Sequence, residues 1–236
     1  MTVDDAELVG IDPFAVLDTE ASRLDRHFSS LDESGWQRPS RCEGWSTREM
    51  LSHLMGVEEY GEACLAEDIP SFMAKAAESG ATSLDSFNEW INRTHAGSST
   101  ERLIAEWRQL SANYRSQLRE RGRDGKIATM VGPYPVGWQA IHIASELATH
   151  ADDIGAPVDP SEQAARVDWR ARLSRFAIAE TEREIEIKAE KGQNHIRVGD
   201  DTAVLSDADL VEAAAGRLDP TYAIPPSIRD GLRAVP

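Results

Sequence analysis

Residues 138–154 read WQAIHIASELATHADDI, and this stretch is the starting point for predicting the fold. It predicts a long helix that ends at Gly155, because glycine readily takes the left-handed conformation that follows a helix. Within it, His142, Glu146 and His150 follow one another at intervals of four residues. Four residues turn a helix by ~400°, so successive members of this series lie only ~40° apart around the axis.

Glu146 and His150 therefore project from one helix face, where they can bind one metal ion. Zinc takes histidine nitrogens and carboxylate oxygens, and three protein ligands leave a fourth position open for chemistry. His53 is our candidate for the third ligand, since it lies near Leu51 and Leu54 and faces towards the core. The spacing leaves other interpretations open. Glu and His four residues apart also form ordinary surface pairs, and a lone histidine near an apolar face is often simply hydrogen-bonded.

His142 has three possible roles in this pattern. It is a candidate for a fourth ligand, for a group that orients the ligands, or for a partly exposed histidine without a role in the site. The sequence favours the third interpretation over the other two.

Three more long helices are predicted before residue 138. Residues 12–31 carry an apolar stripe at helical spacing. Ser46 and Glu49 form a capping-box pattern, which predicts the start of a helix over 46–66. Ser98 and Ser99 open a helix that reaches about residue 121. Between these we expect irregular structure with room for a short helix over 67–82, a short helix over 84–96, and a Gly- and Pro-rich loop over 121–137.

The C-terminal part has a different pattern. Residues 155–163 are typical of a linker, and a helix is predicted over about 167–181. Apolar and charged residues then alternate over 185–190 and again at 196–198, which indicates a β-hairpin. Ser206 is the expected cap of a further helix. We therefore predict a mainly α protein with two domains, a helical bundle over 1–157 and a small α+β domain over 164–236.

Composition limits which binding partners and which cellular compartment we expect. The net charge is −16, from 41 acidic and 25 basic residues. Such a surface repels nucleic acid and anionic lipid, so we expect neither as a partner. The two cysteines, Cys42 and Cys64, form no disulfide framework, and the acidic N-terminus does not resemble a signal peptide. We expect a soluble cytoplasmic protein, monomeric or homodimeric.

Two motifs resemble a known family. The run PSRCEGWSTREMLSHL (39–54), preceded by Trp36, and the later run ELATHADDIG (146–155) resemble the mycothiol-dependent maleylpyruvate isomerase family within the DinB-like superfamily. The C-terminal residues 175–218 also look like the small α+β extension of that family. The resemblance implies a DinB-like four-helix bundle. It also implies that His53, Glu146 and His150 bind a divalent metal, usually zinc.

The resemblance is incomplete around the substrate. Many relatives have an arginine three residues before the metal-binding Glu, where this chain has Ile143. Arg93 is a weak match to an arginine that some relatives use in catalysis, and a solvated helix residue is the favoured interpretation. Together with Trp45 and His142, it is nevertheless a candidate for substrate binding. We interpret Cys42 as structural, since the family chemistry uses an external thiol.

The function that the resemblance implies is thiol activation. A metal-dependent enzyme would activate a low-molecular-weight thiol, mycothiol, for transfer to, exchange on, or isomerisation of a small electrophilic substrate. Two alternatives stay open at this point. One is a thiol-exchange enzyme that acts on a thiol-conjugated metabolite in a biosynthetic pathway. The other is a metal-binding stress or regulatory protein without turnover.

Overall fold

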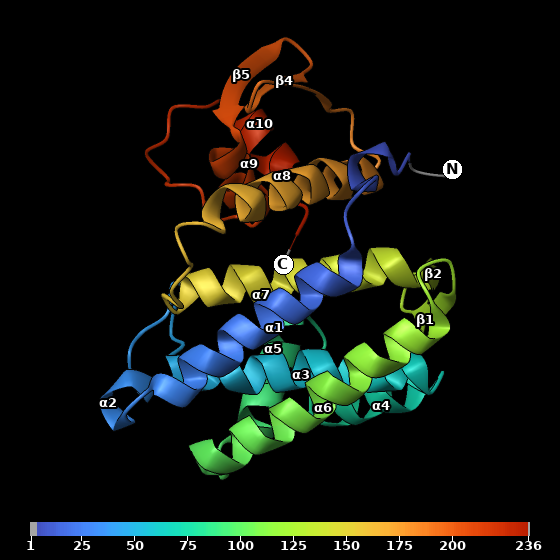
Figure 1. Ribbon diagram of the computed structural model, residues 1–236, viewed down its shortest axis with the longest axis vertical. Helices are drawn as coiled ribbons and strands as arrows, with labels where there is room; N and C mark the ends of the chain where they lie inside the picture. Colours follow the sequence, from blue (N-terminus) through green and yellow to red (C-terminus); the bar gives the residue numbers. More distant parts are fainter. Residues whose placement is uncertain (1–3, 236) are drawn as a thin grey trace. The chain divides into compact units, whose positions relative to one another are not determined.

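The computed structural model describes residues 4–235 (Figure 1). It is mainly helical with small β-sheets, as the sequence predicts. The described residues form two compact units, each with its own core. The first is Pro13–Pro157, and the second combines the residues from Val158 onward with those up to Asp12. The N-terminal segment therefore packs with the second unit, whereas the predicted domains were 1–157 and 164–236.

Four long helices build the first unit and lie alongside one another (Figure 1). They are α1 (Pro13–Ser30), α3 (Thr47–Leu65), α6 (Thr100–Arg121) and α7 (Val136–Asp153). The most extensive contacts pair α1 with α7 and α3 with α6, and α1 also packs against α6. Burial of their apolar stripes forms the core, which includes Leu24, Leu54, Trp107 and Leu147. This is the four-helix bundle expected from the resemblance.

The two helix ends that matter most for the site follow from local sequence. Ser46 and Glu49 form the predicted capping box at the start of α3, and the Glu49 carboxylate accepts the Ser46 backbone N–H at 3.0 Å. At the end of α7, Gly155 takes a φ of 70°. The Gly155 and Ala156 amides donate to the carbonyls of Asp152 and Ala151, which is the Schellman arrangement.

Shorter elements complete the first unit. They are α2 (Glu33–Trp36), α4 (Ile69–Glu78), α5 (Leu84–His95), β1 (Lys126–Thr129) and β2 (Gly132–Pro135). The prediction of a loop over 121–137 was wrong in part, because β1 and β2 pair there as an antiparallel hairpin. Ile127 is buried, and Gly132 has a φ of 102° at the turn. Proline is tolerated in such an isolated edge strand, so its presence did not exclude a strand.

The second unit packs helices on a three-stranded sheet. Its elements are η1 (Ala6–Leu8), α8 (Gln163–Glu180), β3 (Glu186–Glu190), β4 (Gln193–Val198), β5 (Asp201–Ser206), α9 (Asp207–Ala214) and α10 (Pro226–Leu232). The strands are antiparallel in the order β3-β4-β5, with Ile187 opposite Ile196. Helices α9 and α10 contact the sheet, and α8 packs on α9. The hairpin and the Ser206 cap were predicted, whereas β5 and α10 were not.

The helices were also compared with the requirements for a membrane span. Within residues 4–235, none of them combines the length and the apolar character needed to cross a bilayer.

Candidate metal centre

Three side chains from two helices converge inside the first unit. His53 lies in α3, about two turns beyond the Ser46 cap, and Glu146 and His150 lie one turn apart in α7. The Oε1 atom of Glu146 is 2.9 Å from Nε2 of His53 and 3.2 Å from Nε2 of His150. The two imidazole rings meet edge to face, with centroids 4.7 Å apart. The structure therefore brings together the three residues that the sequence indicated as ligands.

The donor atoms are close enough to share one ion. One donor atom from each of His53, Glu146 and His150 lies within 4.8 Å of the other two. Their side chains are only 12%, 7% and 5% exposed, respectively. Two imidazoles and one carboxylate are a donor set that zinc accepts, with room for a further ligand.

The second carboxylate oxygen of Glu146 provides an independent test of fit. This atom, Oε2, is buried and has no hydrogen-bond partner among the described residues. A buried carboxylate oxygen without a partner carries a large desolvation cost. A divalent cation next to Glu146 would offset that cost, so the residues present fit a metal.

The protonation of the site reflects its burial and its charges. Burial by itself would raise the pKa of the Glu146 carboxyl, but the charge of His150 and hydrogen bonds from both histidines hold that pKa far below its usual range. Burial likewise would lower the pKa of His150. This effect of burial is outweighed by the Glu146 charge and by hydrogen bonds with Asp153, Cys42 and Glu146. The pKa of His150 therefore lies well above its usual value.

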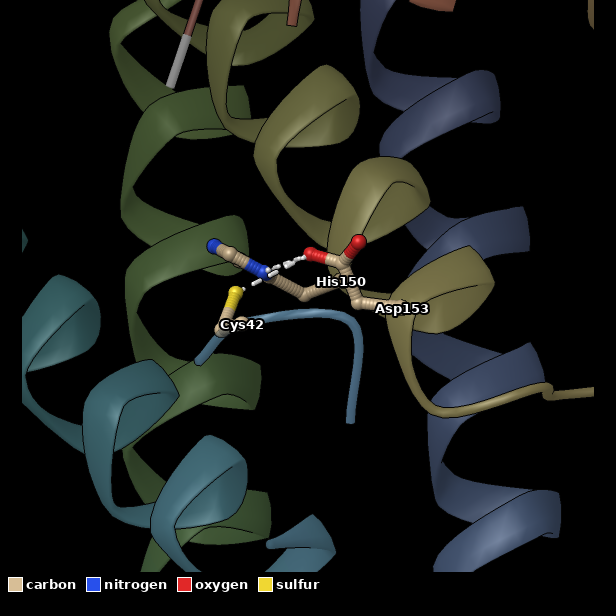
Figure 2. Close-up of side chains that lie close together, drawn as sticks. All are labelled: Cys42, His150 and Asp153. Atoms are coloured by element: carbon tan, nitrogen blue, oxygen red, sulfur yellow. Dashed lines mark hydrogen bonds and ion pairs between the residues drawn. The ribbon is translucent and has the colours of Figure 1, made fainter. Parts of the chain in front are cut away.

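The other ring nitrogen of His150 faces a second group of polar atoms (Figure 2). Its Nδ1 lies 2.9 Å from Oδ2 of Asp153, and the Cys42 thiol donates to the same oxygen at 3.4 Å. An acidic residue at a helix C-terminus is unfavourable for the helix dipole. The contact with Nδ1 of His150 gives Asp153 a partner that offsets this unfavourable position.

A family model matches the bundle. Residues 17–155 match the model described as the mycothiol maleylpyruvate isomerase N-terminal domain. This range spans more than half of the chain and includes all three candidate ligands. The chain belongs to this family.

Solved structures agree with the family at the level of the fold. A crystal structure of the mycothiol-dependent maleylpyruvate isomerase is 17% identical in sequence, with a TM-score of 0.54. A histidine-to-alanine mutant of that isomerase is 18% identical, with a TM-score of 0.55. In both cases the match covers 87% of this chain and 88% of the other. No curated protein sequence matches the chain.

The candidate substrate-binding residues of this family member occupy different surroundings. The centroid of the Trp45 ring lies 5.2 Å from the centroid of the His53 ring, beside the candidate metal centre. His142 is half-buried one turn before Glu146 in α7, and the centroid of its ring lies 6.0 Å from the centroid of the Tyr134 ring. Arg93 is exposed on α5. Among the described residues, His142 belongs to no group of side chains that could hold a metal ion. The predicted role of His142 and Arg93 in substrate binding stays a prediction.

Proposed function

We propose that this chain binds a divalent metal ion, preferably zinc, through His53, Glu146 and His150. We further propose that it uses the site to activate a low-molecular-weight thiol. The observation that carries the proposal is the convergence of the Nε2 atoms of His53 and His150 on Oε1 of Glu146, whose other oxygen, Oε2, is buried without a hydrogen-bond partner among the described residues. Family membership supports the choice of thiol, because the similar solved enzyme is named as mycothiol-dependent.

The residues of the site are arranged for this role. A bound divalent cation supplies a Lewis acid that stabilises a thiolate at neutral pH, where a free thiol is mostly protonated. His53 and His150 would bind the cation through neutral Nε2 atoms and so add no charge to the site, whereas the Glu146 carboxylate adds one negative charge. The donors thus offset only part of a divalent charge and leave the centre attractive to an anionic thiolate. Placement on two long packed helices keeps the donors in position.

The same activated thiolate serves several reactions. Addition to a cis double bond, rotation and elimination isomerise the substrate, whereas addition alone gives S-transfer, and displacement of another thiol gives exchange. The metal donors are common to all three outcomes, so the electrophile decides between them. We propose a small electrophilic substrate without assigning it further.

Elemental analysis combined with a thiol-dependent assay tests the proposal. The purified protein is stripped with a chelator, reloaded with zinc, and assayed with mycothiol and maleylpyruvate or a general electrophile. We expect one bound zinc per chain and turnover that needs both zinc and mycothiol. Glu146→Gln should abolish both, while Glu89→Gln, an exposed residue of α5, should change neither.

Other outcomes would assign or reject the parts of this proposal. Replacement of one thiol by another on a preformed conjugate would support exchange in a biosynthetic pathway. Stoichiometric zinc without turnover for any thiol would reject catalysis and leave a metal-binding stress or regulatory protein. Absence of bound metal from the folded, zinc-reloaded protein would contradict the proposal entirely.

A further inference from the structure

We propose that the loop of residues 40–45, here called the orienting loop, positions both histidine ligands of the metal centre. In this proposal Cys42 and Asp153 are positioning residues that fix the ring of His150, and Trp45 supports the ring of His53. The inference rests on the proposed metal centre and adds residues that would tune its affinity.

Asp153 is the link between the orienting loop and His150. Its side chain is fully buried, and its Oδ2 atom contacts both Nδ1 of His150 and the thiol of Cys42 (Figure 2). A neutral imidazole carries one proton and one lone pair. When Asp153 holds the proton on Nδ1, the lone pair lies on Nε2, the atom that faces Glu146. The carboxylate thereby selects the tautomer that can bind the metal.

The orienting loop holds Asp153 at its backbone and at its side chain. The Arg41 backbone N–H donates to the Asp153 carbonyl at 2.9 Å, and the Cys42 thiol donates to Oδ2. The Arg41 guanidinium lies 4.0 Å from the other carboxylate oxygen. Two groups from successive loop residues therefore restrain the Asp153 carboxylate, and a third holds its backbone. Loss of the Cys42 donor would remove the thiol's restraint on Oδ2, the oxygen that contacts His150.

Internal hydrogen bonds give the orienting loop its own shape. The Ser40 hydroxyl accepts the Cys42 backbone N–H at 3.1 Å and donates to the Trp45 carbonyl at 2.9 Å. The Ser40 amide donates to the same carbonyl at 2.8 Å. Gly44 has a φ of 78°, which lets the chain reverse without strain. The loop is therefore formed by local contacts and can act as a support.

Trp45 extends the same support to the second histidine. The centroids of the Trp45 and His53 rings lie 5.2 Å apart, and the interplanar angle is 46°. Ring packing restricts rotation of the His53 side chain, which is 12% exposed. One six-residue loop thus contacts His53 through Trp45 and His150 through Cys42 and its partner Asp153, although the two histidines lie on different helices.

A second metal ion is the competing interpretation of the same residues. Donor atoms of Cys42, His150 and Asp153 also lie within 4.8 Å of one another. An ion bound there through Nδ1, together with one on Nε2, would require the imidazole of His150 to lose both protons and its hydrogen bond to Asp153. The positioning role keeps that hydrogen bond and needs only one ion, so the geometry favours it.

Zinc affinity measured by competition with a chromophoric chelator tests the proposal on the full chain. We expect Asp153→Asn and Cys42→Ala to weaken zinc binding by about 10- to 100-fold. Cys42→Ser keeps a hydrogen-bond donor and should recover most of the loss. Cys64→Ala, which changes the chain's other, fully buried cysteine, serves as the matched control and should keep the affinity of the native chain.

Two further measurements separate positioning from a general loss of structure. Long-range ¹H–¹⁵N NMR correlations of the zinc-loaded protein should place the proton of the His150 ring on Nδ1. Metal-free variants should keep the far-UV circular dichroism spectrum of the native chain. Affinities within about twofold of native for both Asp153→Asn and Cys42→Ala would overturn the proposal.

The remaining outcomes distinguish this inference from the proposed function. Two zinc ions in the native chain, one of them lost in Cys42→Ala, would overturn positioning in favour of a second site. A single zinc that Glu146→Gln abolishes and that the loop variants leave unchanged would refute only the orienting loop. A native chain that binds no zinc would refute both proposals.

Discussion

The Nε2 atom of His53 lies 2.9 Å from Oε1 of Glu146, although the two residues are 93 positions apart in the chain. His53 belongs to α3, which packs mainly against α6, whereas Glu146 belongs to α7, which packs mainly against α1. Their contact therefore joins the two principal helix pairs of the bundle. An ion held between them would add a further link between the same pairs.

Metal binding should therefore stabilise the protein. Ligands that bind only the folded state stabilise it by mass action, by about 2.7 kcal/mol at a free concentration 100 times Kd. We expect zinc to raise the midpoint of thermal unfolding in the native chain and to have no such effect on Glu146→Gln. Differential scanning calorimetry with and without zinc measures this. An equal rise in both proteins would show that zinc binds elsewhere.

A buried carboxyl in α3 should make stability depend on pH. Burial raises the pKa of Glu58 to about 7, while the Ser111 hydroxyl and the Arg115 charge act in the opposite direction. The folded chain then keeps this proton up to about pH 7, whereas the unfolded chain releases it near pH 4.5. The unfolded state binds fewer protons in between, so the free energy of unfolding falls as pH rises from about 5 to 8.

Glu58→Gln removes this titration and tests the prediction. The variant should gain stability relative to the native chain as pH rises from about 5 to 8, by up to about 3 kcal/mol. Urea unfolding at several pH values measures the difference. Glu89→Gln, at an exposed position of α5, is the control and should follow the native pH profile. A constant difference between Glu58→Gln and the native chain would contradict the buried-carboxyl argument.

Much of the candidate site was predictable because its determinants are local. The capping box at Ser46 sets where α3 begins, and so places His53 about two turns along it. Helical spacing alone puts Glu146 and His150 on one face. The meeting of His53 with that face is a tertiary contact. The core-facing position of His53 made it a candidate for the third ligand, and the family resemblance then implied this specific set of three.

The features that were not predicted depend on packing that is distant in the sequence. Strand β5 reads DTAVLS, with only Leu205 fully buried, and it is defined by pairing with β4 rather than by its own alternation. The Cys42–Asp153 contact joins residues 111 positions apart. No local pattern in the sequence identifies Cys42 as a partner of the acid at the end of α7.

Close packing between α3 and α6 should make Gly61 intolerant of a side chain. A Cβ atom at Gly61 would lie 2.7 Å from the ring of Tyr114, which is fully buried. Alanine gains about 1 kcal/mol of helix propensity, but overpacking of this kind typically costs about 1–3 kcal/mol. We expect Gly61→Ala to lower the free energy of unfolding on balance, as measured by urea denaturation.

A matched glycine serves as the control for Gly61. Gly97 has open space around its Cβ position and a φ outside the left-handed range, so Gly97→Ala should be neutral or slightly stabilising. If Gly61→Ala proved as stable as Gly97→Ala, the close approach of α3 to the Tyr114 ring would be wrong.

The second unit depends on a fully buried asparagine in β4. The Asn194 side-chain amide donates to Oδ1 of Asp207 at 2.9 Å, and its carbonyl accepts from Arg175 at 3.0 Å. Arg175 in turn pairs with Glu7 of the N-terminal segment. Asn194→Ala would remove these two contacts and the donation of the same amide to the Leu205 carbonyl at 3.4 Å, at a cost of about 1–3 kcal/mol. His195→Ala, at the exposed neighbouring position, should cost much less.

Hydrogen exchange measures this difference. We expect β4 and β5 to open faster in Asn194→Ala, with exchange of the bundle helices unchanged. Equal exchange in Asn194→Ala and His195→Ala would contradict the role of Asn194.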